Sequence, residues 1–410
     1  MHPPQDTNDH HDEHALPAPV AQRLHKATHS VLVDPDALQA VRERFDTEQA
    51  HILGHYLTQA QSPNTLRAYR TDWSHFTTWC LAEHRQSLPA DPVDVAVYLA
   101  ACAHTRTTTG TWALATSTLQ RRAAAIAAVH AAHGLASPTR TDVVRTTLRG
   151  IRRTRRTRPQ RKNPLLLHTL EHLLTQRPTD GWPGGVARRR DALLLLTGFA
   201  GALRRSELAD LHLADAHLRT DPTTGHPTLL IELGATKTDQ EGQRGHQVAL
   251  PRGRHPHTCC LCAYTDWTNL LALHHTHGHH TLRTHLQHTA PTPPPPTTHH
   301  CHTLLTHPPQ LPPNTPLLPT IDRHGRIGTR PMSGRAVTEL VKRYAARAGL
   351  DPADFGGHSL RAGFATQAAL GGAGDREIMR QGRWTNPRTV HDYIRTADPL
   401  EDNAVTRLGL

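Results

Sequence analysis

The sequence has few aromatic side chains and no long hydrophobic segment. Aromatic residues make up only 4% of its 410 positions. No stretch of about 18 consecutive apolar residues occurs, so no membrane-spanning helix is expected. The first residues, MHPPQDTNDHHDEH, lack the basic and apolar regions of a secretory signal, so none is expected either.

Cysteine is scarce as well. Six cysteines in a chain of this length do not form the dense framework of a disulfide-stapled extracellular domain. The sequence therefore favours a protein of the reducing cytosol.

Basic residues, in contrast, are in excess. The chain has 46 Lys and Arg residues against 35 Asp and Glu residues, a formal net charge of +11. Such a surplus favours a polyanionic partner, because neutralising phosphates releases their counterions. Membrane surfaces attract cations too, so charge alone does not identify the partner.

Hydrophobic spacing divides the chain into segments. Residues 1–45 are polar and predict a flexible leader. Residues 46–150 carry apolar stripes at helical spacing and predict a small helical domain. Its helices are expected over residues 62–80, 93–103, 119–132 and 141–150.

A basic segment, predicted as a linker over residues 151–163, follows. Eight of the fourteen positions from Arg149 to Lys162 are Lys or Arg, with a proline among them. A solvated inter-domain linker and a segment that contacts phosphates both fit this composition.

Residues 164–410 predict a second, larger domain. Its strands are expected over residues 228–233 and 246–250. Residues 274–312 are rich in His and Pro, with eleven histidines between residues 274 and 307, and predict an inserted flexible loop. Helices are expected over residues 165–174, 187–203, 264–274, 334–348, 358–371 and 376–381.

Several polar and aromatic residues of the second domain form an ordered series. Each has an ordinary interpretation when taken singly, as a helix cap, a solvated lysine or a core aromatic residue. The series is Arg204 with Glu207, Lys237, His358, Arg361, Trp384 and Tyr393.

Together, and in this order, these residues resemble the active site of the tyrosine recombinase (phage integrase) family. The likeness is greatest to the Cre-like branch, in which a segment like Gln381–Asn386 leads to an Asn/Asp-Tyr-Ile-Arg motif, here Asp392–Arg395. Specific motifs cover residues 164–410, and a looser likeness covers residues 60–150.

The resemblance implies a mainly α fold. It comprises an N-terminal helical core-binding (SAM-like) domain and a mainly helical catalytic domain with a small antiparallel sheet, the DNA breaking-rejoining enzyme fold. It also implies a site-specific recombinase that cleaves and rejoins double-stranded DNA through a 3′-phosphotyrosyl intermediate and exchanges strands between two sites. The implied enzyme works as a homo-tetramer in the cytoplasm at the nucleoid, without metal, ATP or any other cofactor.

The implied chemistry assigns a role to each residue type. Tyr393 is the nucleophile, and its hydroxyl, with an ordinary pKa of about 10, must lose its proton during attack. Arg204 and Arg361 stabilise the negative charge on the phosphate, since a guanidinium offers a fixed fork of donors. Arg204 is preferred to Arg205 because the family pattern places a glutamate three residues after the arginine.

The other residues have supporting roles by the same resemblance. Lys237 is the general acid for the leaving 5′-oxygen, and His358 is a second donor or proton relay. Trp384 donates its indole N–H to a phosphate oxygen. Glu207 orients the donors. DNA contacts are expected from Arg152, Arg153, Arg155, Arg156, Arg335, Lys342 and Arg343.

Two other functions compete with recombination. A type IB topoisomerase-like enzyme would share the phosphotyrosine chemistry without exchanging partners, but a helical tail after Tyr393 favours a recombinase. A catalytically silent DNA-binding protein would not need the complete series. The DNA target, the choice between integration, excision and resolution, and the roles of the leader and inserted loop are not determined by the sequence.

A group of Cys and His residues raises a metal-binding alternative. Zinc binds such side chains, but their spacing is not a clean two-plus-two ligand pattern. The expectation is therefore no metal, and a structural zinc site stays the open alternative. The residues concerned are His255, His257, Cys259, Cys260, Cys262, His299, His300, Cys301 and His302.

Overall fold

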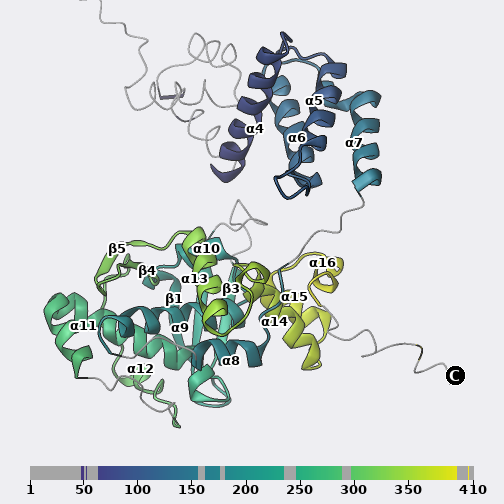
Figure 1. The fold of residues 1–410 in the computed structure, drawn as a ribbon. Helices are drawn as coiled ribbons and strands as arrows, with labels where there is room; N and C mark the ends of the chain where they lie inside the picture. The colour runs from purple at the N-terminus through teal and green to yellow at the C-terminus, as the bar shows by residue number, and fades with distance from the viewer. Residues whose placement is uncertain are drawn as a thin grey trace, which may run out of the picture. The chain divides into compact units, whose positions relative to one another are not determined.

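The computed structural model describes residues 48–49, 52, 63–155, 162–175, 181–234, 246–288, 297–394 and 405. The chain divides into two compact units, unit 1 over Met1–Pro159 and unit 2 over Gln160–Leu410 (Figure 1). Both units are mainly helical and the sheets are small and antiparallel, which confirms the expected fold class. The expected leader over residues 1–45 lies outside the described residues.

Unit 1 is a helical bundle over its described residues. Asp91 caps the start of the helix at Pro92–His104, because its carboxylate accepts a hydrogen bond from the Val93 amide at 2.6 Å. Aromatic rings fill much of the core, where Phe76 and Tyr98 are fully buried with centroids 5.0 Å apart. The helices are α4 (Pro63–Ala82), α5 (Pro92–His104), α6 (Thr116–Ala132) and α7 (Asp142–Arg155), each close to a predicted helix.

The end of α7 corrects the predicted linker. The sequence predicts a linker from residue 151, whereas α7 continues to Arg155. Arg155 is buried, donates to the carbonyls of Ala103 and Leu114, and lies 4.5 Å from the Trp112 ring centroid. These contacts hold its guanidinium inside unit 1 and not on a surface that could contact DNA, so that expectation is wrong.

The core of unit 2 is built around α9 (Gly184–Ala200). This helix has no single apolar face, and Leu193, Leu194 and Leu195 are all fully buried. A helix that is apolar on several sides is enclosed by its neighbours. Those neighbours include α10 (Arg205–Asp210), α11 (Cys260–Gln287) and α14 (Ser359–Leu370), and α8 (Leu167–Thr175) contributes to the same core.

A three-stranded antiparallel sheet in the order β1-β2-β3 packs into the same core. Its strands are β1 (Ala216–Thr220), β2 (Pro227–Leu233) and β3 (His246–Pro251). The sequence predicts β2 and β3, along which buried residues alternate with more exposed ones, but not β1, which is largely exposed. A hairpin of β4 (Pro319–Ile321) and β5 (Ile327–Pro331) was not predicted either.

The predicted inserted loop is partly helical. α11 runs over Cys260–Gln287, with a bend at Gly278, whose φ of 77° suits glycine. Leu282 and Leu286 lie one helical turn apart and are fully buried, so they fasten the second half of α11 to the core. The expectation of a flexible loop beginning at residue 274 is therefore wrong, because histidine content hid this apolar pair. α12 (Thr303–Thr306) forms later in the same insert.

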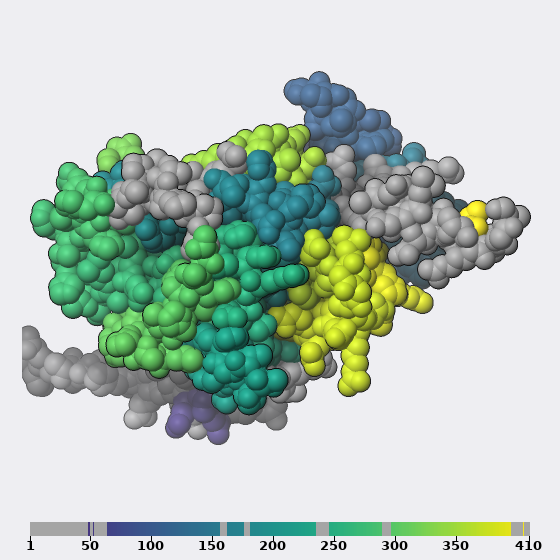
Figure 2. All heavy atoms as spheres, turned by 90° about the horizontal axis from the view of Figure 1, so that it is seen from below, coloured from purple at the N-terminus to yellow at the C-terminus, as the bar shows by residue number. Residues whose placement is uncertain are grey.

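The C-terminal helices form one end of unit 2. They pack around a small core of their own that includes Ala365, Ile378 and Val390. Figure 2 shows α14 to α16, in yellow, gathered as one lobe, while α11 and the segment after it, in green, cover the opposite end of the unit. The helices are α14 (Ser359–Leu370), α15 (Asp375–Gly382) and α16 (Pro387–His391), whereas the preceding α13 (Gly334–Arg347) packs into the main core of unit 2.

No helix among the described residues is both long and apolar enough to cross a membrane. The helical tail predicted after Tyr393, from Thr396 through Leu408, lies outside the described residues except for Val405.

Candidate active site

Arg204 and Glu207 form the first part of the site at the start of α10. Arg204 is the N-cap residue, and its amide donates to the Glu207 carboxylate at 2.8 Å while its guanidinium donates to the other oxygen. N-cap and N3 residues face each other at a helix start, which explains the pairing. Arg205 is exposed and lies 3.4 Å from the Thr338 hydroxyl instead. The local helix geometry thus separates the two neighbouring arginines.

Arg383 reaches the same carboxylate from the end of α15. Its Nη2 donates to Glu207 at 2.8 Å and its Nη1 to the Gly201 carbonyl at 3.1 Å. The residue is buried and has a left-handed φ of 56°, which turns the chain out of α15 toward Trp384. Sequence reasoning assigned no role to Arg383, although it directly precedes the tryptophan of the motif.

Glu207 is held in its charged form. Burial favours the neutral carboxyl, but the charge of Arg383 and the hydrogen bonds and charge of Arg204 together lower the pKa of Glu207 below its ordinary value. Glu207 is therefore a carboxylate at neutral pH that ties two arginines together.

Arg361 lies on α14 and is buried beside this pair. Its guanidinium donates to the carbonyls of Ala202 and Gly382 and lies 4.1 Å from the centroid of the Trp384 ring. Burial, followed by the positive charges of the two other arginines, lowers the pKa of Arg361 to about 9. Arg361 stays mostly protonated at neutral pH, so like charges are crowded here.

Trp384 connects Arg361 to Tyr393. The two aromatic ring centroids are 5.4 Å apart. Gly382 makes room for the indole, since a Cβ there would fall 1.8 Å from its ring. The Tyr393 carbonyl accepts a hydrogen bond at 2.9 Å from Thr366 on α14, so one helix holds both Arg361 and the segment that carries the tyrosine.

His358 lies at the solvent edge of the cluster. It is the N-cap residue of α14, one turn before Arg361, and its side chain is exposed. A histidine there is accessible to a bound substrate and to water.

The arrangement suits a phosphate group. Three guanidiniums surround one carboxylate among the described residues, so positive charge is in excess beside a half-buried tyrosine. Guanidinium donors match phosphate oxygens, and a phenolate is a competent nucleophile. The cluster therefore has the parts for attack on a phosphodiester.

Comparisons with known proteins give the same answer. The model of the phage integrase N-terminal SAM-like domain matches residues 54–132, and the model of the phage integrase family matches residues 321–399. An integrase/recombinase xerD homolog of Selenomonas ruminantium is 30% identical over 356 residues, covering 86% of this chain and 87% of that protein. The chain belongs to the tyrosine recombinase (phage integrase) family. It is thus an enzyme of site-specific DNA recombination through a tyrosine mechanism.

A solved recombinase supports the fold. The XerH site-specific recombinase, in a post-cleavage complex with a palindromic difH substrate, superposes with a TM-score of 0.50 at 12% identity over 94% of this chain and 93% of that one. At this identity the likeness is one of fold. The Cre-like branch stays a prediction.

The fold of this recombinase brings most expected site residues together. Lys237 lies outside the described residues, in the segment between β2 and β3. His358 stands at the edge. Arg204 contacts Glu207, while Arg361 and Tyr393 both contact Trp384, and the structure adds Arg383 as a second partner of Glu207.

The residues expected to contact DNA differ in their surroundings. Arg152 and Arg153 are exposed on α7, and Arg156 lies outside the described residues. On α13, Arg335 is exposed and Lys342 lies 3.4 Å from Glu339.

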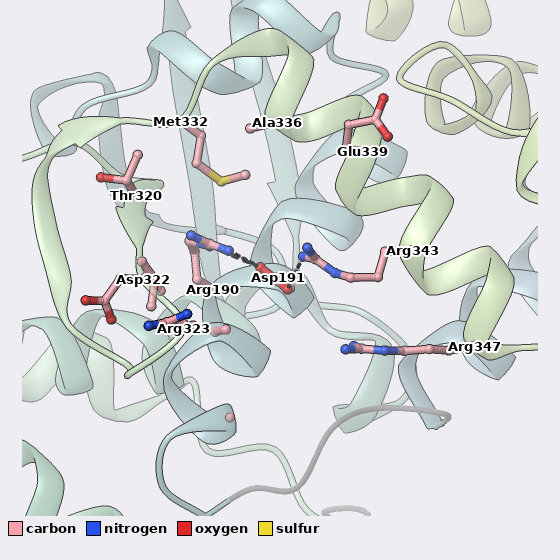
Figure 3. Close-up of a pocket in the computed structure, with 13 residues that line it drawn as sticks. Arg190, Asp191, Thr320, Asp322, Arg323, Met332, Ala336, Glu339, Arg343 and Arg347 are labelled. Carbon is pink, nitrogen blue, oxygen red and sulfur yellow. Dashed lines mark hydrogen bonds and ion pairs between the residues drawn. The ribbon is translucent and has the colours of Figure 1, made fainter.

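Arg343, also on α13, is partly engaged in a contact within the protein. Its guanidinium lies 3.7 Å from the buried carboxylate of Asp191, on the wall of a pocket that Arg190 and Arg347 also line (Figure 3). About half of the Arg343 side chain stays exposed (51%), so it is a weaker candidate for DNA contact than Arg335.

Proposed function

We propose that this recombinase cleaves double-stranded DNA with the Tyr393 hydroxyl as nucleophile and exchanges strands between two sites. The observation that carries the proposal is the crowding of Arg204, Arg361 and Arg383 around Glu207, beside the Trp384–Tyr393 ring pair. Buried like charges repel one another, and a phosphodiester anion bound among them relieves that repulsion.

The proposed step balances as a bond exchange. The Tyr393 oxygen loses its proton and attacks the scissile phosphorus. The new tyrosyl–phosphorus bond forms as the bond to the deoxyribose 5′-oxygen breaks, and the leaving oxygen takes up a proton. The 3′-phosphotyrosyl link keeps the phosphodiester energy, so rejoining by a 5′-hydroxyl needs neither ATP nor another cofactor.

The other site residues either stabilise negative charge on the phosphate or transfer protons. Arg204 and Arg361 stabilise the non-bridging oxygens, and Trp384 adds its indole N–H. Lys237 protonates the leaving 5′-oxygen, and His358 serves as a second donor or proton relay near neutral pH.

Glu207 and Arg383 act as positioning residues. Glu207 accepts hydrogen bonds from both Arg204 and Arg383, and Arg383 also donates to the Gly201 carbonyl. Through these contacts they fix the direction of the Arg204 guanidinium.

The assembly that we propose is a tetramer of protomers on two DNA sites, in the cytoplasm at the nucleoid. Unit 1 is the core-binding domain and unit 2 the catalytic domain. Arg152, Arg153 and Arg335 are exposed cations suited to phosphate contacts. The related integrase/recombinase supports a role in DNA integration or recombination.

The test is a trapping experiment. A library of short duplexes with a randomised interior and a single nick is incubated with the wild-type chain or with Tyr393→Phe. Loss of the short fragment beyond the nick prevents rejoining, so a covalent adduct accumulates and survives denaturation. We expect adducts with wild type alone, and sequencing the trapped DNA then identifies the preferred site.

Three outcomes separate the alternatives. No adduct with wild type on any duplex would mean a silent DNA-binding protein. An adduct with Tyr393→Phe would assign the nucleophile elsewhere. Once a site is known, relaxation of supercoiled DNA without joining of two sites would favour the topoisomerase-like alternative over strand exchange.

A further inference from the structure

A second cluster of reactive side chains lies where α11 begins. Cys259 is the N-cap residue of α11 and Cys262 lies in its first turn, while His299 and Cys301 come from the segment just before α12. The fold brings one ligand atom from each of the four to within 4.8 Å of the others. The three cysteines are buried and the histidine is partly buried. Nothing in the recombination chemistry uses these residues.

The distances fit a small tetrahedral metal site. Zinc–sulfur bonds of about 2.3 Å and zinc–nitrogen bonds of about 2.0 Å place tetrahedral ligand atoms roughly 3.6–3.8 Å apart. Here the Cys262 sulfur and His299 Nδ1 are 3.4 Å apart, and the whole set needs only a small contraction. Three sulfurs and one imidazole fill all four positions, which is the mark of a structural zinc site.

The surroundings orient the ligands. The Gly253 amide lies 3.3 Å from the Cys259 sulfur as a donor, and a Cβ at Gly253 would fall 2.9 Å from the Cys259 Cα. His299 Nε2 lies 3.5 Å from the Arg254 carbonyl, which directs Nδ1 toward the sulfurs. Such outer contacts are typical of metal ligands. The N-terminus of α11 also favours thiolates through its partial positive charge.

One neighbouring cysteine is turned away from the cluster. The Cys260 sulfur lies 3.1 Å from the Thr197 hydroxyl in the core. His300 stays beside the cluster without joining the set, since its Nε2 lies 2.9 Å from the Asp266 carboxylate and 3.3 Å from the Cys262 carbonyl. The fold thus selects four members of a longer Cys and His series, and Cys260 provides a matched control.

We propose that Cys259, Cys262, His299 and Cys301 bind one Zn²⁺ as a closed structural site. The ion fastens the segment before α12 to the start of α11, and so ties the later part of the His- and Pro-rich insert to the core. This proposal replaces the sequence-based expectation of no metal. A disulfide between two of the cysteines would leave the third cysteine and the histidine unexplained.

The test measures metal and not recombination, so it is independent of the proposed activity. The full-length chain, without an affinity tag, is dialysed against EDTA, and zinc is quantified by atomic emission. We expect one tightly held zinc per chain. The 35 histidines can bind further metal weakly, so the zinc is then replaced by Co²⁺. Tetrahedral thiolate ligation gives intense visible absorption and a sulfur-to-cobalt charge-transfer band, whereas histidine ligation alone gives no such band.

Variants locate the site. Cys259→Ser and Cys301→Ser should each lose the retained zinc and most of the charge-transfer band, while Cys260→Ser should keep both. Equal loss in Cys260→Ser, no retained zinc in wild type, or a disulfide found by alkylation and mass spectrometry would overturn the proposal. If a ligand variant does not fold, zinc X-ray absorption on the wild-type chain decides, since the proposal requires three sulfurs and one nitrogen around the metal.

Discussion

Unit 2 buries two clusters of arginine and carboxylate, and they differ in charge balance. In the first, Arg190 donates to Asp191 at 2.6 Å (Figure 3), and the Tyr344 hydroxyl donates to the same carboxylate at 3.2 Å. In the second, among the described residues, three arginines surround Glu207.

The difference separates a structural cluster from a reactive one. Arg190 also donates to the Pro319 carbonyl at 2.9 Å, so the balanced cluster joins α9 to the β4 strand, while Tyr344 joins it to α13. The buried charges of Arg190 and Asp191 are paired, and Arg343, which lies 3.7 Å from the same carboxylate, is half exposed to solvent. Around Glu207 the further arginines are themselves buried, and we infer that a bound phosphate anion balances them. The balance of buried charge, and not the burial of a single arginine, therefore distinguishes the candidate active site.

The largest effect should come from breaking the balanced cluster. Asp191→Asn keeps the side-chain shape but leaves Arg190 buried without its counter-charge. We expect the free energy of unfolding to fall by about 3–5 kcal/mol, as for other buried pairs that lose one partner. Urea unfolding followed by circular dichroism measures it. A loss below about 1 kcal/mol, the range of surface pairs, would mean that this cluster is not structural.

Removing one arginine from the cluster around Glu207 should slow catalysis and leave stability nearly unchanged. For Arg204→Ala we expect DNA cleavage to slow by about a hundredfold or more, the usual cost of one donor to a developing oxyanion. The unfolding midpoint should change little, because repulsion within the cluster decreases. Single-turnover cleavage of the trapped site measures the rate. Arg205→Ala is the matched control, and an equal loss there would shift the assignment to Arg205.

The contribution of the Glu207 charge to folding stability should depend on pH. Its pKa in the folded chain lies below the ordinary value of 4.5, so the stabilisation from its ionised form is complete above pH 4.5 and is lost as pH falls through the folded value. Glu207→Gln should therefore be less stable than wild type by about 1–3 kcal/mol at neutral pH.

The difference in stability between Glu207→Gln and wild type should disappear on acidification. Urea midpoints of both proteins, taken from neutral pH downward, measure it. A gap that is constant with pH would show that the Glu207 charge does not hold the arginines.

The smallest effect concerns unit 1, where two arginines near the end of α7 can be compared. Arg153→Ala should weaken DNA binding a few-fold for all sequences and reduce the slope of log affinity against log salt by about 1. Arg155→Ala should instead destabilise unit 1, because Arg155 is buried. Fluorescence anisotropy across salt concentrations tests the first. An unchanged slope for Arg153→Ala would remove α7 from the DNA-contacting surface.

Much of the fold follows from local patterns. The apolar stripes predicted α4 to α6 and α13 to α15 within a few residues, since helical periodicity is written into the chain. α11 was underestimated because its buried pair, Leu282 and Leu286, stands among histidines. The strand β1 alternates apolar and polar residues over only five positions and fully buries none of them, so its pattern is weak.

The sequence by itself determined the family chemistry of this protein, because Arg204, Arg361, Trp384 and Tyr393 occur in the right order with suitable spacing. Only the tertiary structure decided how charge is distributed around them. Arg383 joins Glu207 from a position 176 residues away, and Arg155 turns into the core of unit 1. The same holds for the Cys and His cluster, whose members meet across the insert. Such choices depend on which side chains long-range packing brings together, and periodicity along the chain does not encode that.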